Sequence, residues 1–344
     1  MKTTAAGAIK RRGFFPQFGH FSASPRRRLP IESIQAWVFL LPAVVILGVF
    51  QIFPAIAAFY MSLFKWDVVQ GAFRGLGNYT DWLYDNAIRS PDFWRSLSTT
   101  FAYFIVTVPL QIALALVLAY LLFQKMRGRG IYRTVYYLPY VTSFVAAAAV
   151  FFWVFHPQYG LVNDVLGIFG VGPQRWLDEP SGVFELAASA FGITLPAWLA
   201  GPSLALVVIS LVTVWHYLGY QIVIFLAGLS NISQEYYEAA RLDGASERQV
   251  FTKITLPLLS PTTFFVFTVA SIGVLRSFDS VYVLTNGFGG PLDTTRTVTL
   301  LVFKTAFQQA QFGLGAALAF ILTLIILLFT LIQFRVLGRR VQYG

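Results

Sequence analysis

The chain has 344 residues with 57% hydrophobic and 12% charged side chains, and its mean hydropathy of +0.66 excludes an ordinary soluble domain, which needs more polar surface. The absence of cysteine excludes disulfides, thiolate metal sites and cysteine nucleophiles. The net charge of +10 is compatible with nucleic-acid binding or with basic residues kept on the cytoplasmic side of a membrane, and the position of the charges distinguishes the two.

The chain begins with a polar, basic segment over residues 1–30. We expect a cytoplasmic N-terminal arm there, ahead of a transmembrane domain over 31–344. An apolar run then starts at Ala36. Although the sequence Ala-Ile-Ala at 55–57 fits the small-residue pattern of signal-peptide cleavage, this run is longer than the apolar core of a signal peptide. We therefore expect an uncleaved first span.

Six segments are long and apolar enough to cross a bilayer, since a helix rising about 1.5 Å per residue needs about 20 residues to cross about 30 Å of hydrocarbon. The sequence therefore predicts an all-α integral membrane protein with six transmembrane helices. Three connections have room for further structure, over 65–95, 157–202 and 285–312. In the last, the stretch TVTLLVFKTAF is too short to cross and is expected to be re-entrant or interfacial. The predicted spans cover about residues 36–64, 97–123, 135–156, 203–230, 262–284 and 313–336.

The distribution of charge orients these spans. With the N-terminus inside, the inside segments are the N-terminal arm, 124–134, 231–261 and the C-terminus, and they hold 17 of the 25 Lys and Arg but only five of the 15 acidic residues. This asymmetry follows the positive-inside rule, so we expect a multi-pass protein with both termini in the cytoplasm. The basic residues are spread over every inside segment instead of one surface, so we do not expect nucleic-acid binding.

The longest inside connection, 231–261, has the local signals of two short helices joined by a sharp turn. Ser233 can cap a first helix over QEYYEAARL, and Gly244 can end it in the left-handed conformation that glycine readily adopts. Ser246 followed by Gln249 is a capping-box pattern that opens a second helix. A plain solvated connector is the alternative, but connections between helices usually take about two to eight residues. We interpret this helix-turn-helix as a docking element for a partner protein.

The same loop resembles a known motif. The stretch EAARLDGASERQVFTKITLPLLSP, residues 238–261, is similar to the EAA motif of the permease subunits of ATP-binding-cassette (ABC) importers. That motif consists of E-A-A, three residues, a glycine, nine residues, an aliphatic residue, any residue, Leu and Pro. The spacing matches throughout, on Glu238, Ala239, Ala240, Gly244, Ile254, Leu256 and Pro257.

Three more stretches resemble the carbohydrate-importer branch, in particular the maltose-type first permease subunit. They are GLGNY (75–79), YRTVYYLPYVTS (132–143) and SFDSVYVLTNGFGGP (277–291), and the resemblance covers about residues 36–338. The chain departs from the family in its long basic arm. It also departs in about twenty extra outer residues, near 177–197, because RWLDEP (175–180) and AWLAGP (197–202) both resemble the family's single Trp-Leu step.

The resemblance implies a type I ABC importer permease in the bacterial cytoplasmic (inner) membrane. It implies a second permease subunit as heterodimer partner, an ATP-binding-cassette ATPase dimer, an extracytoplasmic solute-binding protein and a sugar substrate carried across the lipid bilayer. By position, it also implies ATPase coupling through the loop 231–261. Glu238 would make a charged contact, Ala239 and Ala240 would allow close approach, Gly244 would set the angle between the helices, and Asp243 would belong to the same surface.

Other features argue against an enzyme. The sequence contains no G-x-x-x-x-G-K-[ST] loop, so we expect a separate subunit to hydrolyse ATP. His20, His156 and His216 are far apart, and none has a neighbour at metal-ligand spacing, so we expect no metal site and no cofactor.

Polar and aromatic residues in the fifth predicted span mark a candidate substrate path. Arg276 and Asp279 lie three residues apart, which would place them on one helix face, and charges at bilayer depth normally face a partner or a wet cavity. Pairing with each other, or with a neighbouring helix, to hold the structure is the alternative. Phe278 and Tyr282 flank the charges and offer rings on which a sugar could stack.

The fourth predicted span contributes His216, Tyr220 and Gln221 to the same candidate path. An imidazole or amide facing lipid is costly, so these groups are candidates for the pore. The alternative is that they serve helix packing or belong to an interfacial aromatic belt.

Two other functions remain open. A self-sufficient secondary transporter predicts inverted repeats and broken helices at the midplane, and no repeat between the halves is evident. A permease for a phosphorylated polyol such as glycerol phosphate predicts further basic residues along the path, where Arg276 is the evident candidate. Outside, TNGFGGP (285–291) is expected to be a flexible turn, either a plain loop or, by the resemblance, a surface near the docked binding protein.

Overall fold

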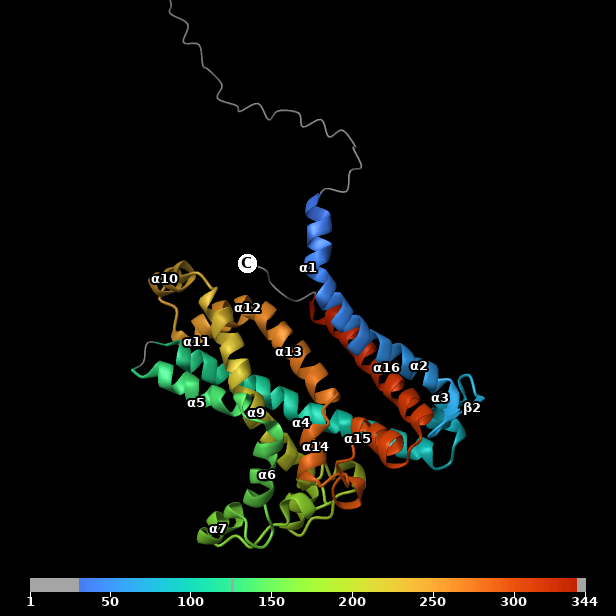
Figure 1. Cartoon of the computed structure of the whole chain (residues 1–344). Helices are drawn as coiled ribbons and strands as arrows, with labels where there is room; N and C mark the ends of the chain where they lie inside the picture. The colour runs from blue at the N-terminus through green and yellow to red at the C-terminus, as the bar shows by residue number, and fades with distance from the viewer. Residues whose placement is uncertain (1–30, 125–126, 339–344) are drawn as a thin grey trace, which may run out of the picture. The chain divides into compact units, whose positions relative to one another are not determined.

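A computed structural model describes residues 31–124 and 127–338, and the chain divides into one unit up to Pro54 and a second from Ala55 (Figure 1). The N-terminal arm predicted over 1–30 lies outside the described residues. The unit up to Pro54 contains α1 (Ile31–Leu47) and a π-helical turn over Gly48–Ile52, followed along the chain by α2 (Phe53–Ser62).

Among the described residues, four helices are long and apolar enough to cross a membrane: Gln35–Ser62, α4 (Arg89–Phe123), α9 (Leu204–Ser230) and α16 (Phe312–Val336). Two further helix pairs meet the same requirement together but are bent. The predicted number of six spans is therefore reached when each bent pair counts as one.

The prediction that residues 135–156 form one continuous helix, the third span, is wrong. This span consists of α5 (Arg129–Val141) and α6 (Phe144–Val154), which meet at 96°. Pro139 has no N–H to continue the helical hydrogen bonds, and the Thr142 hydroxyl donates to the Pro139 carbonyl oxygen at 2.7 Å. Thr142 and Ser143 are both extended, so the chain turns there before α6 begins.

The fifth predicted span, 262–284, is also interrupted. It consists of α13 (Ser260–Leu275) and α14 (Asp279–Leu284), with a break between them. The expectation that Arg276 and Asp279 share one helix face is therefore wrong. Arg276 caps the C-terminal end of α13 and Asp279 lies in the first turn of α14, so each charge complements the dipole of its own helix.

The core of the second unit lies around α9, which packs against α4, α5 and α13. Tyr103 of α4 and Ile209 and Phe225 of α9 are among its fully buried side chains. These contacts fix α9 as one wall of the site described below.

The connection 65–95 folds into a small hairpin that the all-α prediction missed. Phe64 pairs with Phe73 across its two antiparallel strands. The buried Asn78, from the GLGNY stretch, donates to the carbonyl oxygens of Ser62 at 2.8 Å and Phe64 at 2.7 Å. Asn78 therefore satisfies backbone carbonyls where α2 passes into the hairpin. The elements are β1 (Phe64–Trp66), β2 (Gln70–Phe73), α3 (Gly77–Thr80) and a π-helical turn over Asp81–Asp85.

The connection 157–202 includes the stretch near 177–197 where the sequence predicts about twenty extra residues. Both Trp-Leu steps form 3-10 turns. An antiparallel bridge joins Gly182 to Ser203, so the chain between them leaves and returns at one point. A segment closed in this way can be inserted without moving the spans on either side. The elements are α7 (Leu161–Ile168), the 3-10 turns over Trp176–Asp178 and Ala197–Leu199, and α8 (Val183–Ser189).

The glycine-rich turn expected to be flexible in 285–312 is instead held by side chains. Arg296 is only 8% exposed and forms ion pairs with Asp92 at 2.6 Å and with Asp293 at 3.1 Å. Lys304 donates to the Phe288 carbonyl oxygen at 2.9 Å. These contacts tie the turn to α4. The stretch expected to be too short to cross forms α15 (Val298–Phe303) and a π-helical turn over Lys304–Gln308.

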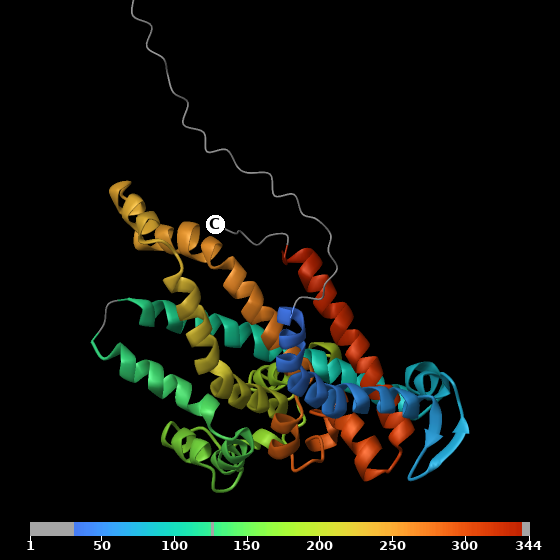
Figure 2. The ribbon, with the colours of Figure 1, turned by 45° about the horizontal axis from the view of Figure 1, so that its top comes forward.

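The loop 231–261 and the connection 157–202 lie at opposite ends of the second unit. Figures 1 and 2 both show the gold segment of α10 (Gln234–Leu242) and α11 (Glu247–Val250) at one end, and the green connection 157–202 at the other. That the first faces the cytoplasm and the second the outside stays a prediction from the count of charges.

Candidate functional site

The loop 231–261 has the two helices that its sequence predicts. Its first helix, α10, covers QEYYEAARL, and the Ser233 hydroxyl accepts a hydrogen bond from the Glu235 N–H at 3.4 Å. Gly244 follows with φ of +72°, the left-handed conformation expected of it. An added Cβ would meet no atom within 4 Å there, so the turn needs glycine because of its backbone conformation and not because of space.

The second helix of the loop is fixed at both ends. Ser246 and Gln249 form the predicted capping box, in which the Gln249 Oε1 accepts from the Ser246 N–H at 2.8 Å. Val250 is buried, and Phe251 packs against Tyr120 of α4 with ring centroids 4.6 Å apart. A π-helical turn over Phe251–Thr255 and α12 (Leu256–Leu258) then lead to α13, after a bend of 63°.

One of the five residues predicted to contact the ATPase does not lie on the surface of this loop. Glu238, Ala239, Asp243 and Gly244 are exposed, whereas Ala240 is buried within its own chain. The sequence analysis missed Leu242, whose side chain is 89% exposed beside them. Leu242 is the one large aliphatic residue in the polar stretch QEYYEAARLDGASERQ, and this is the sequence signal that could have identified it. We call Glu238, Ala239, Leu242 and Asp243 the loop surface.

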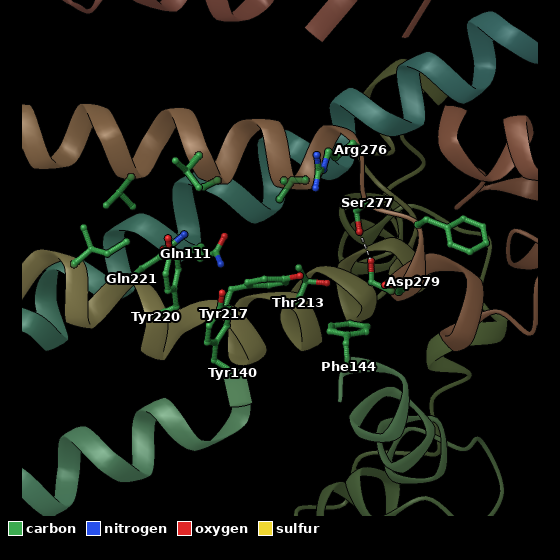
Figure 3. Close-up of a pocket in the computed structure, with 18 residues that line it drawn as sticks. Gln111, Tyr140, Phe144, Thr213, Tyr217, Tyr220, Gln221, Arg276, Ser277 and Asp279 are labelled. Carbon is green, nitrogen blue, oxygen red and sulfur yellow. Dashed lines mark hydrogen bonds between the residues drawn. The ribbon is translucent and has the colours of Figure 1, made fainter. Parts of the chain in front are cut away.

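A cavity of about 360 Å³ lies in the second unit between α4, α5, α9 and the α13–α14 break (Figure 3). Five predicted path residues line it: Tyr220, Gln221, Arg276, Phe278 and Asp279. The cavity also has lining residues that the sequence analysis missed, among them Gln111, Tyr140, Phe144, Thr213, Tyr217, Ser277 and Ser280.

Two predicted path residues do not line the cavity. His216 is buried behind it, with its ring 4.8 Å from that of Phe144. Tyr282 stacks on Phe278 with ring centroids 5.0 Å apart and is not among the lining residues. His216 therefore serves helix packing, which was the alternative to a place in the substrate path. Tyr282 supports the ring of Phe278.

Arg276 and Asp279 are the charged residues among the described lining of the cavity. Both are exposed, and within the described chain neither side chain forms an ion pair or a side-chain hydrogen bond. The alternative that they pair with each other is therefore wrong for this structure. The two charges remain available to a ligand or to another subunit.

Aromatic rings and hydroxyls complete the wall. Tyr140, at the end of α5, stacks on Tyr220 of α9 with centroids 4.8 Å apart and an interplanar angle of 19°. Tyr103 lies behind the wall, and its hydroxyl is 2.7 Å from that of Thr213 and 3.1 Å from that of Ser280. Ser280 in turn lies 2.6 Å from Ser277 at the α13–α14 break. These hydroxyls link α4, α9 and α14 behind one face of the cavity.

Sequence signals existed for part of what was missed. Gln111 interrupts the apolar run VPLQIALALV, and an amide inside a span is a signal of function. Tyr140 and Phe144 could not be assigned, because they reach the cavity only through the 96° bend. Among the described residues, no group of three or more His, Asp or Glu could hold a metal ion.

Comparison with known proteins gives consistent matches. Residues 86–343 match the family described as "Binding-protein-dependent transport system inner membrane component". The lactose transport system permease protein of Rhizobium radiobacter is 32% identical over 304 residues, 88% of this chain and 93% of that protein. The trehalose/maltose transport system permease protein of Thermococcus litoralis is 31% identical, over 89% of this chain and 94% of that one.

A solved structure has the same fold. A chain of a bacterial alginate ABC transporter, in complex with a periplasmic protein that holds an alginate pentasaccharide, superposes with a TM-score of 0.69 at 19% identity. The match covers 91% of this chain and 97% of that chain.

Proposed function

The chain belongs to the family of binding-protein-dependent transport system inner membrane components, and from this premise we propose that it is one of two permease subunits of an ATP-driven sugar importer. The predicted resemblance to ABC importer permeases is thus confirmed, and the chain is a multi-pass inner-membrane transport subunit, not an enzyme. Sugar is proposed because the relatives named above carry lactose, trehalose and maltose.

The cavity is the observation that carries the proposal. It offers a pair of stacked tyrosines, two amides and several hydroxyls, and its two charges have opposite sign. Flat rings and uncharged polar groups suit a molecule that has an apolar face and many hydroxyls. A glycerol phosphate would bring a dianion to a wall where, among the described lining residues, the one cation is Arg276 and Asp279 accompanies it. The charge balance therefore favours a neutral sugar over the phosphorylated alternative.

We propose that a second, different permease subunit covers the open side of this cavity. Exposed charges at bilayer depth need protein or water around them, and Arg276 and Asp279 lack partners within the described chain. A heterodimer would enclose them in a central path. Both termini are proposed to lie in the cytoplasm, on the same side as the loop 231–261.

The loop surface is proposed to dock on a separate ATPase subunit. Glu238 and Asp243 offer charges, Ala239 allows close approach, and Leu242 offers an apolar contact for a groove. The Gly244 turn and the capping box hold these side chains in one arrangement. Movement of the ATPase would pass through Phe251 and Tyr120 into α4, which lines the cavity at Gln111.

The proposal is tested with the assembled importer in proteoliposomes, given its solute-binding protein loaded with lactose, trehalose, maltose or sn-glycerol 3-phosphate. We expect at least one sugar to raise ATP hydrolysis and to enter the vesicles, and sn-glycerol 3-phosphate to do neither. Uptake of sn-glycerol 3-phosphate with no uptake of any sugar would establish the phosphorylated-polyol alternative instead.

A further inference from the structure

Two glutamines in the cavity wall have buried amides without partners. Gln111 of α4 is 2% exposed and Gln221 of α9 is 4% exposed, and the Oε1 atom of each has no hydrogen-bond partner. Neither amide makes any hydrogen bond within the described chain. Figure 3 shows both toward the end of the cavity that carries Tyr220, with Arg276 and Asp279 toward the other end.

A third buried glutamine is paired through one of its two amide atoms. Gln333 of α16 is as buried as Gln221 and its Oε1 also lacks a partner, but its Nε2 donates to the Ser271 hydroxyl of α13 at 3.0 Å and it does not line the cavity. Burying an amide without a partner destabilises a folded protein. Gln111 and Gln221 line the cavity, so a ligand there can supply the missing partner once either amide turns its oxygen toward the space.

We propose that Gln111 and Gln221 form an uncharged hydroxyl-binding subsite for one ring of the transported sugar, an inference that rests on the proposed function. Each amide has an oxygen that accepts a hydrogen bond and a nitrogen that donates one. A sugar hydroxyl can also donate or accept, so the two glutamines can bind hydroxyls with either direction of hydrogen bond. The stacked rings of Tyr220 and Tyr140 lie beside Gln221 and offer a flat surface to the apolar face of the sugar.

The subsite determines which part of a substrate can lie there. Among the described lining residues, the charges are at the other end of the cavity, so an anionic group beside the two amides would be buried without a counter-charge. A neutral ring therefore occupies the glutamine end. Any charged or strongly polar substituent of the substrate points toward Arg276 and Asp279.

The first test is stability without a substrate. Met has nearly the volume of Gln and needs no hydrogen bond, so Gln111→Met and Gln221→Met remove the unpaired amides. We expect the melting temperature of the assembled importer in detergent, without substrate, to stay the same or to rise in both variants. The matched control, Gln333→Met, loses its bond to Ser271, and we expect its melting temperature to fall.

The second test is the number of sugar molecules taken up per ATP hydrolysed, with lactose and trehalose as probes on the loaded binding protein. In Gln111→Met and Gln221→Met we expect this ratio to fall by about tenfold, the size of two lost hydrogen bonds to a neutral ligand. In Gln333→Met we expect it to stay within about twofold, since that amide is outside the cavity.

The outcomes separate this inference from the proposed function. Sugar uptake by the wild-type importer with an unchanged ratio in both cavity variants would overturn the subsite and leave the importer assignment in place. A fall in melting temperature in both variants as large as that of Gln333→Met would show that the amides are structural, and would overturn it too. Uptake of sn-glycerol 3-phosphate by the wild type, with no uptake of lactose, trehalose or maltose, would contradict the sugar-importer assignment and the subsite together.

Discussion

A Cβ atom on Gly219 would clash with the backbone carbonyl oxygen of Tyr136, so α9 and α5 touch through their backbones beside the cavity. Such close approach is possible only where one helix has no side chain. The contact also sets the position of Tyr140, one turn further along α5, against Tyr220 of α9. The aromatic face of the cavity therefore depends on a glycine that does not line it.

Replacing Gly219 with Leu should separate the two helices. We expect a loss of about 1–3 kcal/mol in the free energy of unfolding, the usual cost of overpacking, together with loss of sugar uptake. Unfolding in SDS and uptake into proteoliposomes measure the two effects. Gly167→Leu is the matched control, because an added Cβ meets nothing within 4 Å there. Equal stability of Gly219→Leu and wild type would mean that the backbones do not touch.

The hydroxyl of Tyr103 should couple α4 to α9 energetically. A double-mutant cycle of Tyr103→Phe with Thr213→Val should give a coupling free energy of about 0.6 kcal/mol, the average for hydrogen bonds between membrane helices. The control cycle pairs Tyr103→Phe with Thr268→Val, whose hydroxyl bonds to a carbonyl of its own helix, and should show no coupling. Similar values in the two cycles would contradict the hydroxyl link behind the cavity wall.

The outer turn should depend on Arg296. Replacing it with Met leaves Asp92 without its cation and leaves Asp293 with only its longer ion pair to Lys304, at 3.7 Å. We expect a loss of about 1–3 kcal/mol, less than for a fully buried pair, since the Asp92 side chain is 42% exposed. Chymotrypsin should then cut faster at Phe288, which is exposed on the turn. Arg175→Met removes an exposed arginine elsewhere and should change neither quantity. An unchanged rate of cleavage at Phe288 in Arg296→Met would contradict the claim that Arg296 holds this turn in place.

Local signals predicted the parts of the molecule that depend on local chemistry. The bounds of α10, the left-handed turn at Gly244 and the capping box of Ser246 and Gln249 all follow from residues within a few positions of one another. The long apolar helices α4, α9 and α16 follow from composition for the same reason.

The breaks in the spans could not be predicted in this way. Pro139 marks a possible end of a helix, but the 96° turn also needs the Thr142 hydroxyl and the packing of α5 on α9. The α13–α14 break separates Arg276 from Asp279, and it is supported by hydroxyls from α4 and α9 that are more than sixty positions away in the sequence. The cavity was therefore predicted only in part, since its wall comes from six helices, α4, α5, α6, α9, α13 and α14.

The most direct test of the account is substrate-stimulated ATP hydrolysis by the assembled importer with Gly244→Val. The turn has φ of +72°, which a β-branched residue adopts only with strain, so the loop surface should no longer fit the ATPase. Gly244→Asn tolerates this conformation better and should keep part of the stimulation. Gly130→Val is the matched control, at a helical glycine with nothing within 4 Å.

The account predicts that the loaded binding protein stimulates the wild type and Gly130→Val, that Gly244→Asn responds in part, and that Gly244→Val inserts and folds but stays at the basal rate. Full stimulation of a correctly assembled Gly244→Val importer would contradict coupling through this loop.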